Sequence, residues 1–198
     1  MLVRDYQQFQ PLQDVADALF FKNKEYPEYI FKRHYLHYYT MESSVAVEFE
    51  FLQSLAEFCG DDNISLVHFH PAGEGFWLKH YGHYGAITAK AGIAGNEWNS
   101  DLVEDTIGDY MRLYSADGKA VIFGNMGEWC IFREYSFDLA VLGATFDLSR
   151  VKETSLTQYV HDADWAVDYW KSSASRMDEA FYETFRANYS GSRRRPEV

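Results

Sequence analysis

Apolar and polar positions follow two different patterns along this chain. In the middle, short segments alternate with a period of two or are wholly apolar, which predicts strands. We expect strands at residues 64–69, 84–90, 120–123, 128–133 and 137–143, with a hairpin turn at residues 124–127. Elsewhere, apolar residues recur every three or four positions, which predicts helices instead.

Helices are expected on both sides of these strands and once between them. The apolar spacing predicts them at residues 12–22, 29–39, 43–58 and 98–113, and again from residue 155 onward. Ser43 or Ser44 would cap the third helix. Residues 29–39 could also form a strand, and residues 45–51 alternate as well. Strands in the middle and helices toward both ends predict an α+β fold, with a mostly antiparallel central sheet on which N- and C-terminal helices pack.

Length and composition favour one domain with a substantial core. We expect a single domain at residues 1–189 and a flexible tail at residues 190–198, because no repeat or Pro/Gly/Ser-rich linker divides the 198 residues. Hydrophobic residues make up 47% of the chain, yet no run of them is long enough to span a membrane and no signal sequence is visible. The expected compartment is therefore the cytoplasm, where Cys59 and Cys130 would stay reduced.

Acidic residues are concentrated in the middle of the chain. Residues 41–147 hold 17 Asp and Glu against 5 Lys and Arg, a difference that equals the whole net charge of −12. This charge argues against nucleic acid or an anionic membrane as a partner. It is consistent either with a solvated surface or with a docking surface for a basic protein. The densest acidic stretch contains five acids and no base: Glu97, Asp101, Glu104, Asp105 and Asp109.

Four histidines form the most enzyme-like feature. His68 and His70 are two apart on a predicted strand, so both side chains would face one side and could share a metal ion with His80 or His83. The His-x-His-Pro string also resembles part of the JAMM metalloprotease motif, but this chain lacks the Ser-x-x-Asp that follows it in that family. We therefore expect no metal and no cofactor. A small metal-dependent hydrolase built on these histidines is the alternative function.

Other catalytic patterns are missing from the sequence. No Gly-x-Ser-x-Gly nucleophile elbow, phosphate-binding loop or dinucleotide-binding fingerprint is present. Carboxylate pairs are common in a chain with 30 acidic residues, so they are weak indicators of acid–base catalysis. The sequence therefore predicts a protein that binds rather than catalyses.

One segment resembles a known family. Residues 128–135 (Glu-Trp-Cys-Ile-Phe-Arg-Glu-Tyr) follow a turn and are followed by an Asp-containing strand at residues 137–142. Upstream lie a helix ending in Gly-Asp-Asp, a strand, the loop with Tyr-Gly-His-Tyr-Gly at residues 81–85, and an acidic helix. This arrangement, over residues 41–147, resembles immunity proteins of bacterial polymorphic toxin systems. The resemblance implies a cytoplasmic protein that binds a cognate toxin domain and neutralises it without catalysis.

A docking surface and a core can then be assigned. The toxin domain is expected to be basic, and the acidic stretch beginning at Glu97 would contact it, with the oligomeric state left open. The expected anchors are the aromatic residues of the nearby loop: Phe76, Trp77, Tyr81 and Tyr84. Trp129 is expected to be buried in the sheet core, and Arg133 could form an ordinary cross-strand ion pair with Glu134 or Asp138.

Overall fold

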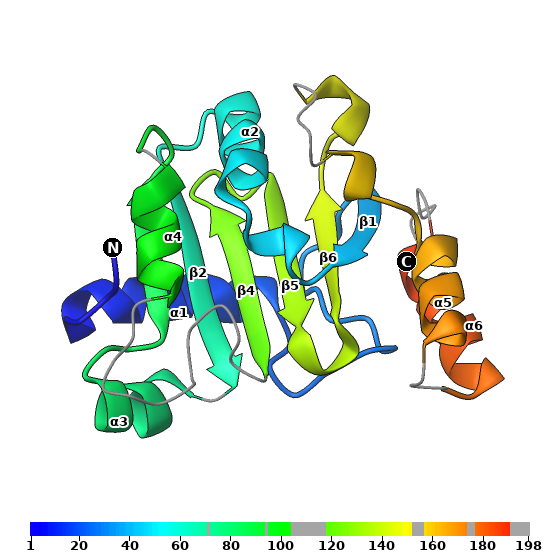
Figure 1. The fold of residues 1–198 in the computed structure, drawn as a ribbon, viewed down its shortest axis with the longest axis horizontal. Helices are drawn as coiled ribbons and strands as arrows, with labels where there is room; N and C mark the ends of the chain where they lie inside the picture. Colours follow the sequence, from blue (N-terminus) through cyan, green and yellow to red (C-terminus); the bar gives the residue numbers. More distant parts are fainter. Residues whose placement is uncertain (71, 94, 104–117, 152–156, 174–176, 191–198) are drawn as a thin grey trace.

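One antiparallel sheet forms the centre of the protein. The computed structural model describes residues 1–70, 72–93, 95–103, 118–151, 157–173 and 177–190. Within these residues, six strands follow the order β1-β6-β5-β4-β2-β3, and every neighbouring pair is antiparallel (Figure 1). The strands are β1 (His37–Glu42), β2 (Asn63–His70), β3 (Ala86–Lys90), β4 (Lys119–Gly124), β5 (Trp129–Glu134) and β6 (Leu139–Ala144). The predicted α+β fold is confirmed, and so are the five strands expected from the sequence.

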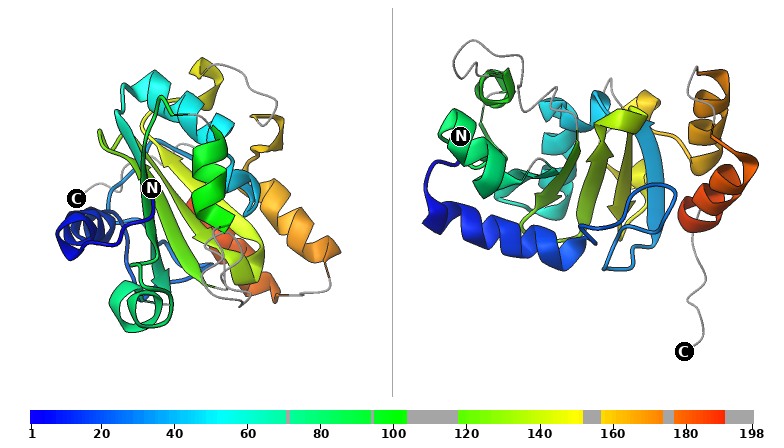
Figure 2. Two further views of the ribbon diagram at one scale, coloured as in Figure 1. Left: turned by 60° about the vertical axis from the view of Figure 1, so that its left-hand side comes forward. Right: turned by 90° about the horizontal axis from the view of Figure 1, so that it is seen from below.

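Helices cover both faces of this sheet. On one face lie α2 (Phe49–Cys59) and α4 (Gly95–Val103), while α1 (Tyr6–Leu19) crosses the other (Figures 1 and 2). Every residue of β5 and β6 is consequently buried. The core on the α2 side contains Trp129 and Trp98, and the core on the α1 side contains Phe132. Apolar strands buried on both sides explain why β6 reads as a continuous apolar run instead of alternating.

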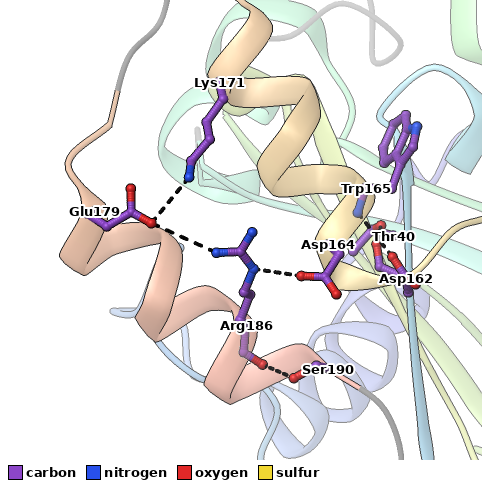
Figure 3. Close-up of polar contacts among 8 residues, drawn as sticks. All are labelled: Thr40, Asp162, Asp164, Trp165, Lys171, Glu179, Arg186 and Ser190. Atoms are coloured by element: carbon purple, nitrogen blue, oxygen red, sulfur yellow. Dashed lines mark hydrogen bonds and ion pairs between the residues drawn. The ribbon is translucent and has the colours of Figure 1, made fainter.

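A pair of helices stands beside the β1 edge. α5 (Ala163–Ser172) and α6 (Glu179–Tyr189) are joined at their surface by Arg186, whose Nε donates to Asp164 Oδ1 at 2.6 Å (Figure 3). Lys171 also pairs with Glu179 at 3.2 Å. These pairs are solvent-exposed and contribute little stability, so the pair is held mainly by buried aromatic residues. One of these is Trp170 of α5, whose ring centroid lies 4.8 Å from that of Phe185 of α6.

The segment that leads into α5 is hydrogen-bonded to the edge strand β1. The backbone of Thr40 in β1 exchanges two hydrogen bonds with His161, and the Thr40 hydroxyl donates to the carbonyl of Asp162. The Asp162 carboxylate in turn accepts from the Trp165 N–H at 3.0 Å, which caps α5 (Figure 3). The edge strand and the first turn of α5 therefore share one hydrogen-bonded junction.

Residues 29–39 do not form the predicted helix. They form an irregular segment that enters β1 at His37. Aromatic side chains of this segment fill the core next to α6, with the rings of Tyr29, Phe31 and Tyr38 all about 6 Å from Tyr189. Because an extended chain can bury rings on the same core as a helix can, aromatic spacing alone gave the wrong element here.

Helix boundaries differ from the sequence expectations for local reasons. α1 begins at Tyr6 because the Asp5 carboxylate accepts the Gln7 N–H at 2.8 Å, and it continues through Pro11. The predicted helix at 43–58 is divided into a short 3-10 turn at Val45–Val47 and α2. Ser43 does not cap it, because its hydroxyl donates to Asp138 Oδ1 at 2.9 Å. Gly60 ends α2 in the left-handed conformation, which glycine adopts without strain.

Helices also follow β3 and β6 in the chain. α4 covers the beginning of the helix predicted at 98–113, and its continuation lies outside the described residues. The C-terminal helical region consists of a 3-10 turn at Thr157–Tyr159, α5 and α6. α6 ends at Tyr189, and residues 191–198 of the predicted tail are likewise not described. No helix in the described part of the chain is long and apolar enough to cross a membrane.

Candidate functional site

The aromatic loop between β2 and β3 is built around a buried tryptophan. A π-helical turn at Gly73–Leu78 leads into the short helix α3 (Lys79–Tyr81). Trp77 has no exposed surface, and its ring centroid lies 5.1 Å from that of His68 and 5.4 Å from that of His83. The loop is therefore fixed to the sheet by its largest side chain.

This burial corrects part of the predicted docking surface. Trp77 and Tyr84 were expected as exposed anchors, but both are buried, and the Tyr84 ring stacks on Phe9 of α1 at 4.6 Å. Phe76 and Tyr81 remain half-exposed. Two of the four predicted aromatic anchors thus belong to the core, and the other two keep a surface that a partner could contact.

The four histidines do not face one another as the sequence suggested. A β-bulge interrupts the pairing of β2 with β4 between His68 and His70, so the expected alternation is broken there. His68 is buried against Trp77, whereas His70 and His80 are exposed. Within the described part of the chain, no three His, Cys, Asp or Glu side chains form a group able to hold a metal ion. The geometry gives the metal-hydrolase alternative no support.

His83 is a structural group. Its Nδ1 accepts the Gly85 N–H at 3.1 Å, and burial together with the nearby charge of Arg4 lowers its pKa to about 4. A neutral imidazole with its proton on Nε2 is therefore the form present at neutral pH. It holds the turn into β3 and stacks on Trp77.

Asp61 also stabilises a turn through hydrogen bonds, at the opposite end of the sheet. Its carboxylate accepts hydrogen bonds from the Met126 N–H and from Trp129 Nε1, the latter at 2.8 Å, and fixes the β4–β5 turn. Trp129 is fully buried, as predicted. A Cβ at Gly124 would lie 2.1 Å from Asp61 Oδ2, so only glycine fits at that position. Cys59 and Cys130 are both free thiols.

An acidic groove lies at this same end of the sheet. Two cavities of about 590 and 300 Å³ share Asn63, Lys90 and Ile93 in their walls. The first is also lined by Asp62 and the second by Glu97, and both of these carboxylates are exposed. Lys90 is the single basic side chain among the lining residues of the two cavities.

The groove contains the described beginning of the predicted acidic stretch. Glu97 lies in the first turn of α4, where its negative charge is favourable to the helix dipole. Asp101 belongs to the same helix. Glu104, Asp105 and Asp109 lie outside the described residues. The aromatic loop follows the end of β2, at the other end of the sheet from the start of α4, which carries Glu97 (Figure 1).

A third cavity, which we call the Glu134 cavity, lies at the end of the sheet opposite the groove. It measures about 510 Å³ and is lined by Lys22, Glu25, Phe69, His70, Gly118, Lys119, Glu134 and Ser136. Lys119 Nζ pairs with Glu25 Oε2 at 3.0 Å and also donates to the Lys24 carbonyl at 3.3 Å. Glu134 Oε1 accepts from the Ser136 hydroxyl at 3.3 Å, while Oε2 finds no hydrogen-bond partner among the described residues.

Glu134 is the residue that sequence reasoning missed. It is 4% exposed, and burial raises the pKa of its carboxyl to about 7. Lys119 opposes this shift, and Glu25 adds to it. The sequence places Glu134 next to Arg133 at a strand end, which suggested an ordinary ion pair. The burial of Glu134 could have been inferred from the apolar run in the neighbouring strand, because such a run indicates a sheet that is covered on both faces.

The chain was also compared with known proteins. No protein-family model, curated protein or solved structure matches it. Its function must therefore be argued from its own residues.

Proposed function

We propose that this chain is a non-enzymatic, cytoplasmic immunity protein that binds a cognate, basic toxin domain through an acidic surface. The observation that carries the proposal is the position of the negative charge. The entire net charge of −12 belongs to residues 41–147, the span whose strand and turn pattern resembles toxin immunity proteins. A surface of this kind attracts a basic partner over long range and raises the rate of association.

The acidic groove is the part of this surface best suited to docking. It combines a concave shape with exposed carboxylates at Asp62 and Glu97, and the partly buried Ile93 gives it an apolar contact. Concave sites with a small apolar centre and a charged rim are typical of protein interfaces. Phe76 and Tyr81, being half-exposed, form a separate contact area that a larger toxin domain could reach.

The proposal is tested by protection and by binding. Candidate toxins are the variable C-terminal domains of large secreted proteins encoded directly upstream of the gene. Co-expression of this chain should restore growth to cells that produce the cognate domain, and the two purified proteins should form a stable complex. If no such domain is bound or neutralised, the proposal is wrong.

Charge variants then locate the docking surface. Replacing Glu97 by Gln and Asp101 by Asn should slow association severalfold at low salt and weaken its salt dependence, because rim charges act mainly on the on-rate. A matched control replaces Asp168 by Asn and Glu183 by Gln, which removes the same charge from exposed positions on α5 and α6. Stopped-flow association at two salt concentrations measures both. Equal rates for the two variants would remove α4 from the docking surface.

A further inference from the structure

Two lysine side chains, Lys22 and Lys119, line the Glu134 cavity. The carboxyl groups in its wall are those of Glu25, which is exposed, and Glu134, which is buried. Burial raises the pKa of the Glu134 carboxyl and keeps it partly protonated near neutral pH, so it does not cancel a full positive charge. In a chain with a net charge of −12, two lysines beside a partly neutral carboxyl favour an anionic ligand.

We propose that the Glu134 cavity binds a small organic anion that presents a phosphate or carboxylate group to Lys22, Lys119 and Glu134. The inference does not rest on the proposed toxin binding, since it concerns the opposite end of the sheet and needs no protein partner.

The two lysines can change partners at low cost. Lys119 is largely buried, with 17% of its side chain exposed, but Glu25, its carboxylate partner, is 62% exposed. Lys22 pairs at 2.7 Å with Asp17, and its ammonium lies 5.7 Å from the centre of the Phe69 ring. Ion pairs with a solvent-exposed carboxylate contribute little stability, so a ligand oxyanion in the cavity can replace them.

Glu134 offers a bound ligand a hydrogen-bonding atom that has no partner among the described residues. Its Oε1 accepts from Ser136, so in the neutral carboxyl the proton is on Oε2. That buried atom has no partner among the residues that the structure describes. A buried polar group without a partner is destabilising, and an oxygen of a bound anion supplies the missing acceptor. The raised pKa of this carboxyl keeps the neutral form available near neutral pH.

The size of the cavity and the aromatic ring in its wall argue for an organic body on the anion. A volume of about 510 Å³ falls within the range of small-molecule sites and is far larger than a bare phosphate needs. Phe69, half-exposed in the wall, offers a ring face to the body of the ligand. An anion with a ring or a short apolar chain fits these walls better than an inorganic ion does.

Calorimetric titration of the purified chain tests the inference, with AMP, benzoate and adenosine as probes at constant ionic strength. AMP or benzoate should bind saturably with one site per chain, whereas adenosine, which has no anionic group, should not. Saturation by AMP alone identifies a phosphate ligand, and saturation by benzoate alone identifies a carboxylate ligand. If neither anion binds into the millimolar range, or if adenosine binds as tightly as AMP, the inference is overturned.

Variants assign the binding to this cavity. Lys119→Met and Lys22→Met should each weaken the affinity at least about tenfold, because each removes a charge-assisted hydrogen bond. Glu134→Gln should bind as the wild type does, since the amide keeps a neutral donor in the same place. The matched control is Lys171→Met on α5, a helix that contributes no residue to the cavity wall, and its affinity should be unchanged. Lys22 is half-exposed, so its variant remains informative if Lys119→Met does not fold. Equal affinities for Lys22→Met and Lys171→Met would refute the assignment.

Discussion

Replacing Glu134 by Gln is expected to stabilise the fold above neutral pH and to leave it unchanged in acid. Burial raises the pKa of the folded-state carboxyl from 4.5 to about 7. Below pH 4.5 the group is protonated in both the folded and the unfolded chain, so it makes no difference to stability. As the pH rises toward about 7, the unfolded chain ionises first, and the wild-type protein loses stability.

The expected loss can be worked out from that shift. A rise from 4.5 to about 7 corresponds to about 3 kcal/mol, and the full amount is lost once the pH exceeds the folded-state value. Gln cannot ionise, and it fills the same volume while its oxygen still accepts from Ser136. The variant should therefore be more stable than the wild type by about 3 kcal/mol at alkaline pH and equal to it in acid.

Urea unfolding at a series of pH values, followed by tryptophan fluorescence, measures this difference. The matched control is Glu25→Gln, which changes a neighbouring carboxyl that is 62% exposed and should show no comparable gain. A difference between Glu134→Gln and the wild type that does not change with pH would refute the reasoning. So would a wild-type protein that is the more stable of the two at alkaline pH.

Three further predictions concern the interior. Trp129→Ala should cost about 3–5 kcal/mol in urea unfolding, because it opens a cavity and removes the donor to Asp61 Oδ2, leaving only the Met126 N–H on Oδ1. Gly124→Ala should cost at least about 2 kcal/mol, since the new methyl group clashes with Asp61, whereas Gly92→Ala, with open space around it, should be neutral. In NMR titrations His83 should stay neutral down to a pH of about 4, and its contribution to stability should disappear as the pH falls from 6.5 to that value.

The sequence predicted the sheet well because its strands carry strong local signals. The β4–β5 hairpin has apolar strands separated by a turn with two glycines, and β6 follows within a few residues. Such patterns depend only on residues close together in the sequence, so strands can be predicted from them without knowledge of the tertiary structure. The fold class followed from the order of these elements.

The errors arose where distant contacts decide the outcome. The rings of residues 29–39 pack on α6, about 150 positions later in the chain, and nothing local distinguishes that packing from a helix face. Trp77 and Tyr84 were predicted as anchors because they belong to an aromatic loop near the acidic stretch. Their burial depends on the sheet and on α1, which contribute His68 and Phe9 to their surroundings.

Glu134 was missed for a different reason. A glutamate at a strand end is exposed in most sheets, and only the closure of both faces makes this one a buried acid. The covered faces could be inferred from the apolar strands, but the cavity beside Glu134 is formed by residues from four separate parts of the chain. Sites of this type are visible only once the fold is known.

The closed edges of the sheet determine how a partner can be recognised. Residues Met1 and Val3 pair with β3 and occupy its outer edge, and His161 occupies the middle of β1 at the other side. The outer edge of β3 is thus already paired, and so is the middle of β1. The sheet is therefore poorly suited to β-augmentation, in which a partner adds a strand through main-chain hydrogen bonds. A protein that binds here must read side chains and surface charge, so its specificity can change by substitution at exposed positions while the sheet stays intact.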